Sequence, residues 1–220
     1  MCIRDRVHLF PHWNWKGKEG QVIPVTCYTN CDTVELFLNG KSFGEKGYEF
    51  PRLGMEGTYG NYPPRARALR TTSDLHLSWD VPYESGTLKA VGMKDGQVVA
   101  TVEVSTAGEA AALALSADRK TLSANHRDVV HIVVEVRDEQ GHRVPSSEND
   151  ITFQIEGEGA LIGVDNGDPQ SHEDYKATHR KAFDGLCLAI VQSTQNAGRI
   201  KISASSPGLG SQSVTISTGA

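Results

Sequence analysis

Short stretches of alternating apolar and polar residues dominate this sequence, whereas the helical period is almost absent. Alternation over roughly four to eight residues, bounded by turn formers, predicts half-buried β-strands. Val22–Thr29 predicts one such strand, and Val34, Leu36 and Leu38 predict the buried face of the next. Many short strands with regular turn signals are typical of β-sandwiches. The predicted fold class is therefore all-β, with two tandem immunoglobulin-like β-sandwich domains.

Two dipeptides mark tight turns between predicted strands. Asn39-Gly40 and Asp95-Gly96 each separate two alternating segments, and this kind of dipeptide is the strongest local signal for a β-hairpin. The segment before the second hairpin predicts a further strand and places Trp79 in the core. The residues expected to share its buried face are Leu75, Leu77, Trp79 and Val81.

The strand pattern stops and restarts near residues 107–111, where most side chains are small. We therefore expect a first β-sandwich domain at 7–106 and a C-terminal immunoglobulin-like domain at 107–220, each near the ~100 residues of that fold. The first six residues, MCIRDR, fit neither domain. They resemble a tag that recurs at the ends of assembled metagenomic reads, so 1–6 is expected not to be native and the chain to be a fragment.

Charge and hydropathy narrow the classes of partner. The formal net charge is -5, which argues against a nucleic-acid backbone or an anionic membrane as the main partner. No apolar run approaches the roughly 20 residues that a membrane-spanning helix needs. The basic, proline-rich segment at 61–70 predicts a solvated surface loop, with docking on an acidic neighbour as the alternative.

The four cysteines do not form a zinc set. Cys27 and Cys31 lie four positions apart, and no second pair completes the ligands that a structural zinc ion requires. Two buried thiols at a strand end are predicted, with a disulfide between them as the alternative. Cys2 belongs to the suspected tag, and Cys187 lies in a predicted strand.

Motifs for hydrolytic and phosphate chemistry are missing. The sequence has no GxSxG, HExxH or GxxxxGK[ST] pattern, and His8 and His12 lack a third metal ligand at a useful spacing. Glycoside hydrolysis needs two carboxylates with separated pKa values across a sugar pocket, and no Asp or Glu has the apolar, aromatic surroundings that would separate them. We predict no catalytic residue, no cofactor and no metal site.

The densest polar segment is Gly163–Phe183. Its acidic residues do not follow the EF-hand spacing, while its Asn-Gly and Asp-Pro dipeptides are turn formers. We predict an ordered docking loop rather than a calcium site. The candidate docking residues are Asp165, Asn166, Asp168, His172 and Glu173.

Three segments resemble the C-terminal part of bacterial glycoside hydrolase family 2 enzymes of the β-galactosidase type. In that family two β-sandwich domains follow a sugar-binding jelly roll, an immunoglobulin-like domain and a TIM barrel that carries both catalytic glutamates. The resemblance covers nearly the whole chain from Val7. The segments are "VHLFPHWNWKGKEGQVIPVTCYTNCDTVELFLNGKSFG", "WDVPYESGTLKAVGMKDGQVV" and "LIGVDNGDPQSHEDYKATHRKAFDGLCLAIVQST".

The resemblance implies a non-catalytic accessory region whose partner is the catalytic barrel of the same parent chain. It implies a parent that hydrolyses terminal β-linked galactose, or a related sugar, with retention, and that is exported to the periplasm or the cell exterior. His12, Trp13 and Trp15 would then contact either the barrel or a sugar at the rim of its active site. The alternatives are a stand-alone carbohydrate-binding module and an adhesin module of immunoglobulin-like type.

Overall fold

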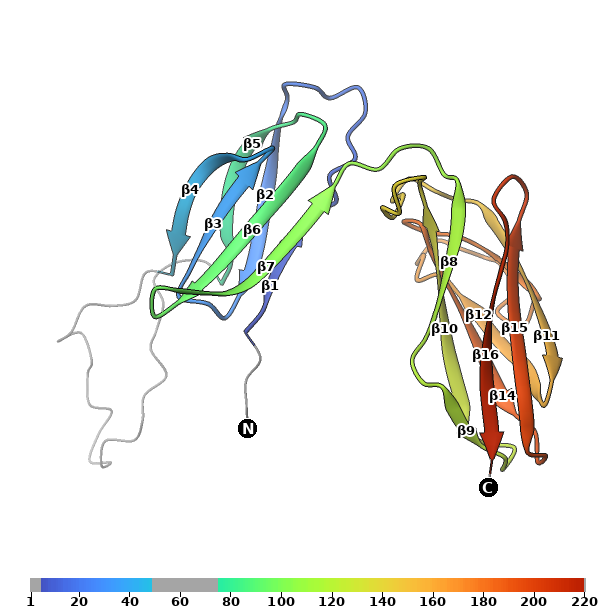
Figure 1. The fold of residues 1–220 in the computed structure, drawn as a ribbon. Helices are drawn as coiled ribbons and strands as arrows, with labels where there is room; N and C mark the ends of the chain where they lie inside the picture. The colour runs from blue at the N-terminus through green and yellow to red at the C-terminus, as the bar shows by residue number, and fades with distance from the viewer. Residues whose placement is uncertain (1–4, 49–74, 220) are drawn as a thin grey trace, which may run out of the picture. The chain divides into compact units, whose positions relative to one another are not determined.

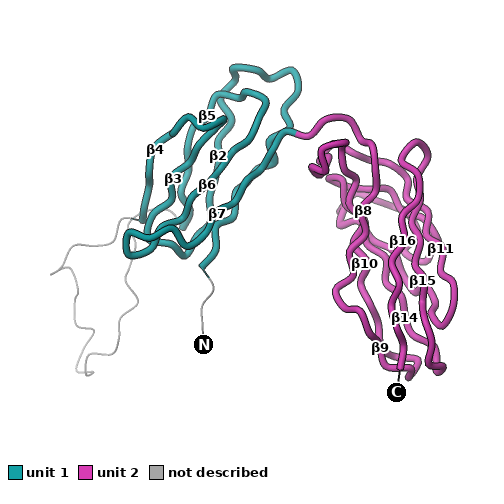
Figure 2. Tube along the Cα trace, viewed as in Figure 1, with its two compact units in different colours: residues 1–106 teal, residues 107–220 magenta. Residues whose placement is uncertain are grey.

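The structure, a computed structural model, describes residues 5–48 and 75–219 (Figure 1). It consists of two compact units, residues 1–106 and 107–220 (Figure 2). The described residues form strands, turns and loops and no helix, which confirms the all-β prediction. The basic loop predicted at 61–70 lies outside the described residues.

Unit 1 is a sandwich of two antiparallel sheets. One sheet has the strand order β1-β2-β5, and the other has the order β4-β3-β6-β7. The described residues of this unit form seven strands, in sheets of three and four, which match the strand count of a constant-type immunoglobulin sandwich. The strands are β1 (Val7–Phe10), β2 (Val22–Thr29), β3 (Thr33–Leu38), β4 (Lys41–Gly47), β5 (Leu77–Pro82), β6 (Thr87–Lys94) and β7 (Gln97–Ser105).

Both predicted hairpin turns are present in unit 1. Asn39 and Gly40 join β3 to β4 with φ angles of 50° and 80°, and Asp95 and Gly96 join β6 to β7 with 49° and 74°. Positive φ at both central residues defines the type I′ turn, which matches the twist of the flanking strands. The side chain of Asn39 also accepts a hydrogen bond from the backbone N–H of Thr87 at 2.9 Å, which ties the first turn to β6.

The predicted burial pattern of unit 1 is confirmed with one exception. Val34 and Leu36 are fully buried, and Trp79 is 3% exposed. Leu75 was expected in the core but is 77% exposed. The pairing of β5 with β2 begins at Leu77, so Leu75 precedes the strand and no sheet carries it over the core.

Unit 2 is a sandwich of a four-stranded and a five-stranded sheet. The strand orders are β12-β14-β10-β8 and β13-β11-β15-β16-β9. The nine strands exceed the seven of a constant-type immunoglobulin sandwich, and two of them, β9 and β13, have only three residues each, too few to give an alternating pattern. The strands are β8 (Ala112–Ala117), β9 (Thr121–Ser123), β10 (Val129–Arg137), β11 (Asp150–Gly157), β12 (Gly159–Asp165), β13 (His179–Lys181), β14 (Leu186–Ser193), β15 (Gly198–Ser206) and β16 (Gly210–Gly219).

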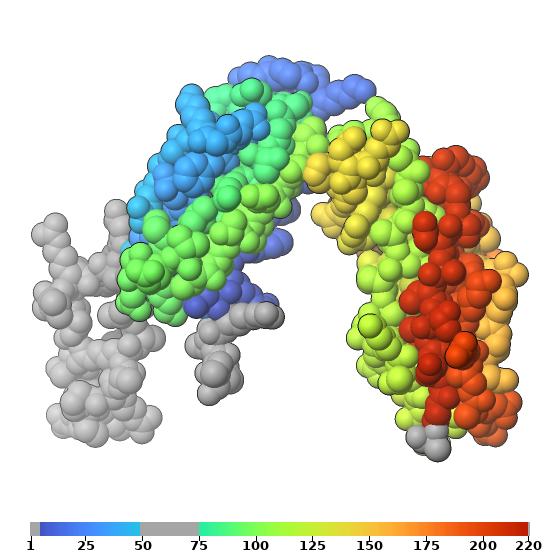
Figure 3. All heavy atoms as spheres, in the orientation of Figure 1, coloured from blue at the N-terminus to red at the C-terminus, as the bar shows by residue number. Residues whose placement is uncertain are grey.

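The core of unit 2 lies between its two sheets. Ile132 on β10 faces it from one sheet, and Ile200, Ile202 and Ile216 on β15 and β16 face it from the other, all fully buried. Figure 3 shows the side chains of β16, in red, beside those of β15 on the surface of this unit. Alternation along each strand therefore places one set of side chains in the core and the other in solvent.

Candidate functional site

Trp13 fills the core of unit 1. Its side chain is fully buried, its indole Nε1 donates a hydrogen bond to the carbonyl of Glu84 at 2.9 Å, and its ring meets that of Tyr83 edge-on with centroids 5.2 Å apart. The hydroxyl of Thr106 donates to the Trp13 carbonyl at 2.6 Å. Trp13 has no exposed area. Of the three residues predicted to contact a barrel or a sugar, only His12 and Trp15 are therefore accessible to a partner.

His12 and Trp15 form a stacked, half-buried pair. Their ring centroids lie 4.7 Å apart with an interplanar angle of 26°, and Trp15 Nε1 donates to the His12 carbonyl at 3.0 Å. The backbone N–H of Asn14 donates to His12 Nδ1 at 3.2 Å. The turn thus holds both rings in a fixed orientation. Their predicted contact with a barrel or a sugar stays a prediction.

One face of the sheet β1-β2-β5 exposes aromatic and apolar side chains. Phe10 is 59% exposed, Val22 56% and Tyr28 52%. His8 and Tyr28 are paired in register across β1 and β2, and Phe10 lies two positions further along β1, so alternation puts them on one side. We call His8, Phe10, Val22 and Tyr28 the outer aromatic face. Contiguous exposed apolar side chains mark contact surfaces, and in this face the neighbours are Phe10 and Tyr28, because Val22 lies at the other end of β2.

The predicted docking loop, residues 165–179, is built from Asx turns. Asp165 Oδ1 accepts hydrogen bonds from the backbone N–H groups of Asn166 at 2.7 Å and Gly167 at 3.2 Å. Asn166 Oδ1 accepts from Asp168 at 3.0 Å, and Asp168 Oδ1 accepts from Gln170 at 2.9 Å. These side-chain oxygens therefore fix the path of the loop itself.

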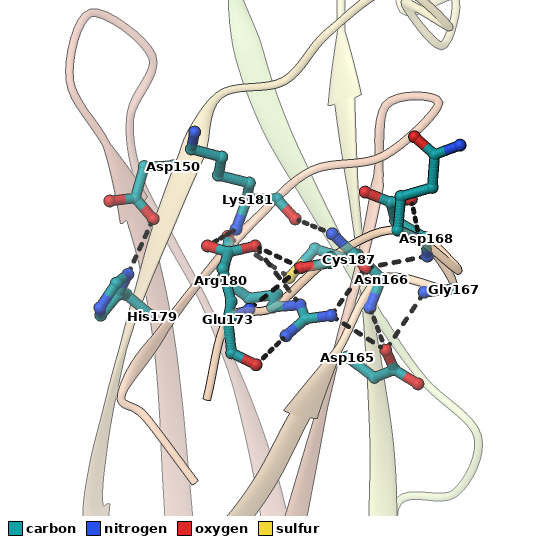
Figure 4. A network of polar contacts seen from close by, with 12 residues as sticks. Asp150, Asp165, Asn166, Gly167, Asp168, Glu173, His179, Arg180, Lys181 and Cys187 are labelled. Carbon is teal, nitrogen blue, oxygen red and sulfur yellow. Dashed lines mark hydrogen bonds and ion pairs between the residues drawn. The ribbon is translucent and has the colours of Figure 1, made fainter. Parts of the chain in front are cut away.

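The buried side chain of Arg180 holds this loop through hydrogen bonds and ion pairs. It is fully buried, and its two terminal nitrogens donate to the Glu173 carbonyl and to Asn166 Oδ1, both at 3.0 Å (Figure 4). Ion pairs join it to Asp165 at 3.5 Å and Glu173 at 3.7 Å, and its guanidinium carbon lies 4.8 Å from the centre of the Tyr175 ring. A buried charge requires such compensation.

The sequence analysis missed the central role of Arg180. The signal that could have shown it is positional, because Arg180 occupies the inward position of β13 between exposed His179 and Lys181. Of the other predicted loop residues, His172 is exposed. The docking role of the loop remains untested.

Asp150, Glu173 and His179 lie together at the edge of unit 2. Each offers one ligand atom, and these atoms all lie within 4.8 Å of one another. Asp150 and His179 are 29 residues apart in the sequence, and the pairing of β11 with β13 brings them together. The prediction of no metal site considered Glu173 but neither of these partners.

The three described cysteines are free and buried, which confirms the burial predicted for Cys27 and Cys31. Burial raises the pKa of the Cys27 thiol to about 11 and that of Cys187 to about 12. Thiols with raised pKa values stay protonated at neutral pH and are poor nucleophiles. Cys27 and Cys187 are therefore packing residues rather than nucleophiles.

Two tandem β-sandwich units, one with an exposed aromatic face and one with an ordered polar loop, define a protein of the tandem β-sandwich class. Residues 113–215 match the family glycoside hydrolase family 2 C-terminal domain 5, and residues 20–100 match a domain of unknown function, DUF4982. Within the described ranges, no helix has both the length and the hydropathy to cross a membrane.

The curated relatives are much longer than this chain. The β-galactosidase BoGH2A of Bacteroides ovatus is 40% identical over 204 residues, which are 92% of this chain and 21% of that enzyme. A putative β-glucuronidase of Formosa agariphila is 35% identical over 76% of this chain and 14% of its own length. The chain therefore spans about a fifth or less of these two relatives.

Solved structures of longer glycosidases also match this chain over only part of their length. A β-glycosidase from Bacteroides vulgatus superimposes with a TM-score of 0.82 and 32% identity over 98% of this chain and 25% of its own. A glycosyl hydrolase family 2 member from Bacteroides cellulosilyticus gives a TM-score of 0.77 and 34% identity over 95% of this chain and 24% of its own. The chain belongs to the C-terminal β-sandwich region of glycoside hydrolase family 2.

Proposed function

We propose that this chain supports the catalytic TIM barrel of a longer family 2 glycosidase and itself carries out no catalysis. The observation that carries the proposal is its correspondence to about a fifth of a β-galactosidase, in a region matched by a C-terminal domain family. The catalytic glutamates implied by the family resemblance belong to the barrel. The matched segments at 20–100 and 113–215 correspond to other domains.

The outer aromatic face is the surface that we assign to contact with the barrel. Fully burying an exposed Phe side chain is favourable by roughly 1.5–3 kcal/mol, before the costs of association are subtracted. Phe10 and Tyr28 expose more than half of their area. The stacked pair of His12 and Trp15 is the proposed second contact, either with the barrel or with a bound sugar. The polar loop at 165–179 is proposed to dock on a further part of the parent.

The sugar of the parent is proposed only by class. The relatives include enzymes named as β-galactosidases and as β-glucuronidases, so a terminal β-linked galactose or a related sugar is the proposed substrate class. A first test is whether the purified chain hydrolyses aryl β-galactosides or β-glucuronides. We expect no turnover above buffer. Turnover that survives repurification and disappears when an Asp or Glu of this chain is mutated would overturn the proposal.

A chimera tests the supporting role directly. The region of the Bacteroides ovatus β-galactosidase that aligns with this chain would be replaced by residues 7–219, and the half-life of activity at elevated temperature would be measured. We expect Phe10→Ser and Tyr28→Ser to shorten that half-life several-fold. Val98→Ser is the matched control, since Val98 is 62% exposed on β7 of the opposite sheet. Equal effects of all three substitutions would contradict the assigned surface.

A further inference from the structure

Three segments of unit 2 contribute one side chain each to the cluster of Asp150, Glu173 and His179. Asp150 begins β11, His179 begins β13, and Glu173 comes from the loop between β12 and β13. Asp150 and His179 project from the same side of the paired strands, which puts His179 Nδ1 3.1 Å from Asp150 Oδ1. The pairing of β11 with β13 therefore brings two of the three ligand atoms together.

Glu173 is held in place from the protein side. Its carboxylate accepts long hydrogen bonds from the Ser171 hydroxyl at 3.2 Å and the Lys181 N–H at 3.3 Å. Figure 4 shows this carboxylate between the Asp150–His179 pair and the guanidinium of Arg180. Neither hydrogen bond is short for a charged acceptor, so Glu173 retains capacity for another partner.

Arg180 supplies a second, independent observation. Its Nε atom is fully buried and has no hydrogen-bond partner among the described residues, although it points at Glu173 Oε2 from 3.7 Å. Carboxylates that bind metals are fixed by hydrogen bonds from outside the ligand set. In Figure 4 the Arg180 guanidinium lies on the other side of the Glu173 carboxylate from Asp150 and His179, so it can hold that carboxylate from outside the three-residue cluster.

We propose that Asp150, Glu173 and His179 form a three-ligand site for a divalent transition metal, with Zn²⁺ as the best match. One imidazole nitrogen and two carboxylate oxygens suit zinc, and three protein ligands leave a position for water. Calcium and magnesium favour all-oxygen shells, so the imidazole of His179 favours zinc over these two ions. Asp150 and His179 are each 51% exposed, which gives the ion an open path from solvent.

Titration of the 220-residue chain, prepared without a histidine tag, with Zn²⁺ tests the site by calorimetry and by thermal melting. We expect one zinc ion per chain, a rise in the midpoint of unfolding that a chelator reverses, and no comparable rise with Ca²⁺. His179→Gln and Asp150→Asn should weaken zinc binding at least tenfold. Both side chains are about half exposed, so neither substitution should prevent folding.

His131→Gln is the matched control. His131 Nδ1 lies 3.2 Å from Asp118 Oδ2 and is similarly exposed, but this pair is not in a group of three ligands. The control should bind zinc as the unmodified chain does, and the ring nitrogens of His179, not His131, should shift in NMR spectra. Absence of zinc binding, wild-type affinity in His179→Gln, or an equal loss in His131→Gln would overturn the proposal.

Discussion

Unit 1 and unit 2 differ in which side chains they bury and which they expose. Unit 1 fully buries the indole of Trp13 and leaves other large apolar side chains in solvent, whereas unit 2 buries the charged Arg180 and exposes few large apolar side chains. Among the described residues, the exposed large apolar side chains number six in unit 1 and two in unit 2. They are Phe10, Val22, Tyr28, Leu75, Val98 and Val99 in unit 1, and Tyr175 and Phe183 in unit 2.

The difference indicates different tasks for two similar sandwiches. Exposed apolar side chains on a sheet face are costly in solvent and gain free energy when a partner covers them. A buried arginine with several partners instead orders a loop within its own domain. Unit 1 is therefore suited to being covered, and unit 2 is suited to presenting a fixed surface.

Replacement of Trp13 is expected to have the largest effect. Trp13→Ala removes a fully buried indole and its hydrogen bond to the Glu84 carbonyl, so unit 1 should lose about 4 kcal/mol of unfolding free energy. Urea unfolding followed by fluorescence and circular dichroism measures this loss. The transition of unit 2 should not move.

Trp15→Ala is the control for this prediction. Trp15 is half-buried and packs only partly against the core of unit 1, so the loss should be well below that of Trp13→Ala. Equal losses for the two variants would show that both indoles belong to the core of unit 1, and would leave neither indole for an outside partner.

The second prediction concerns the buried charge of unit 2. Arg180→Met keeps much of the side-chain volume but leaves Asp165 and Glu173 without their cation. Breaking a fully buried ion pair costs roughly 3–5 kcal/mol. Because these carboxylates are 45% and 26% exposed, we expect about half of that, ~2 kcal/mol. Exposed Arg199→Met should leave the melting midpoint unchanged, and an equal loss there would show that the effect is not specific to Arg180.

Local patterns predicted the parts of the fold that local chemistry determines. Asn39-Gly40 gave a hairpin turn because both residues tolerate positive φ, and alternation placed Val34 and Leu36 in the core. The turn-forming residues of the loop at 165–179 were enough to predict that it is ordered. Its partners could not be predicted, because Asp150 comes near it only through the pairing of β11 with β13, and the inward position of Arg180 lies on a strand of three residues, too short for an alternating pattern. Long-range register brings those charges together, and no local pattern encodes it.

The third prediction concerns the first residues of unit 2. Asp138 is 4% exposed and accepts hydrogen bonds from the backbone N–H groups of Gly108 and His142, both at 2.8 Å. Asp138→Asn replaces a charged acceptor by a neutral one. We expect a loss of about 1 kcal/mol at neutral pH, measured by thermal melting of residues 107–220.

The pH dependence of that loss follows from the ionisation of Asp138. Burial by itself would raise the pKa of Asp138, but the hydrogen bonds from Gly108 and His142 and the charge of His142 lower it below its ordinary value. A carboxylate with a lowered folded-state pKa stabilises the fold above its unfolded-state pKa, and this contribution is lost as pH falls through the folded-state value. The gap between the two proteins should therefore close in acid. A gap that widens on acidification would contradict this assignment.

The smallest expected change in unfolding free energy comes from substitutions in the outer aromatic face, and it tests the comparison between the units most directly. If the outer aromatic face exists to be covered, its side chains contribute little to the isolated chain. Phe10→Ser and Tyr28→Ser should each change the unfolding free energy of unit 1 by no more than about 0.5 kcal/mol, while lowering self-association in sedimentation experiments because the exposed apolar area shrinks. Val98→Ser, on the opposite sheet, is the matched control. Losses above 2 kcal/mol for Phe10→Ser would mean that this side chain already packs within unit 1. The face would then be a part of the core of the sandwich and could not be a surface awaiting the barrel.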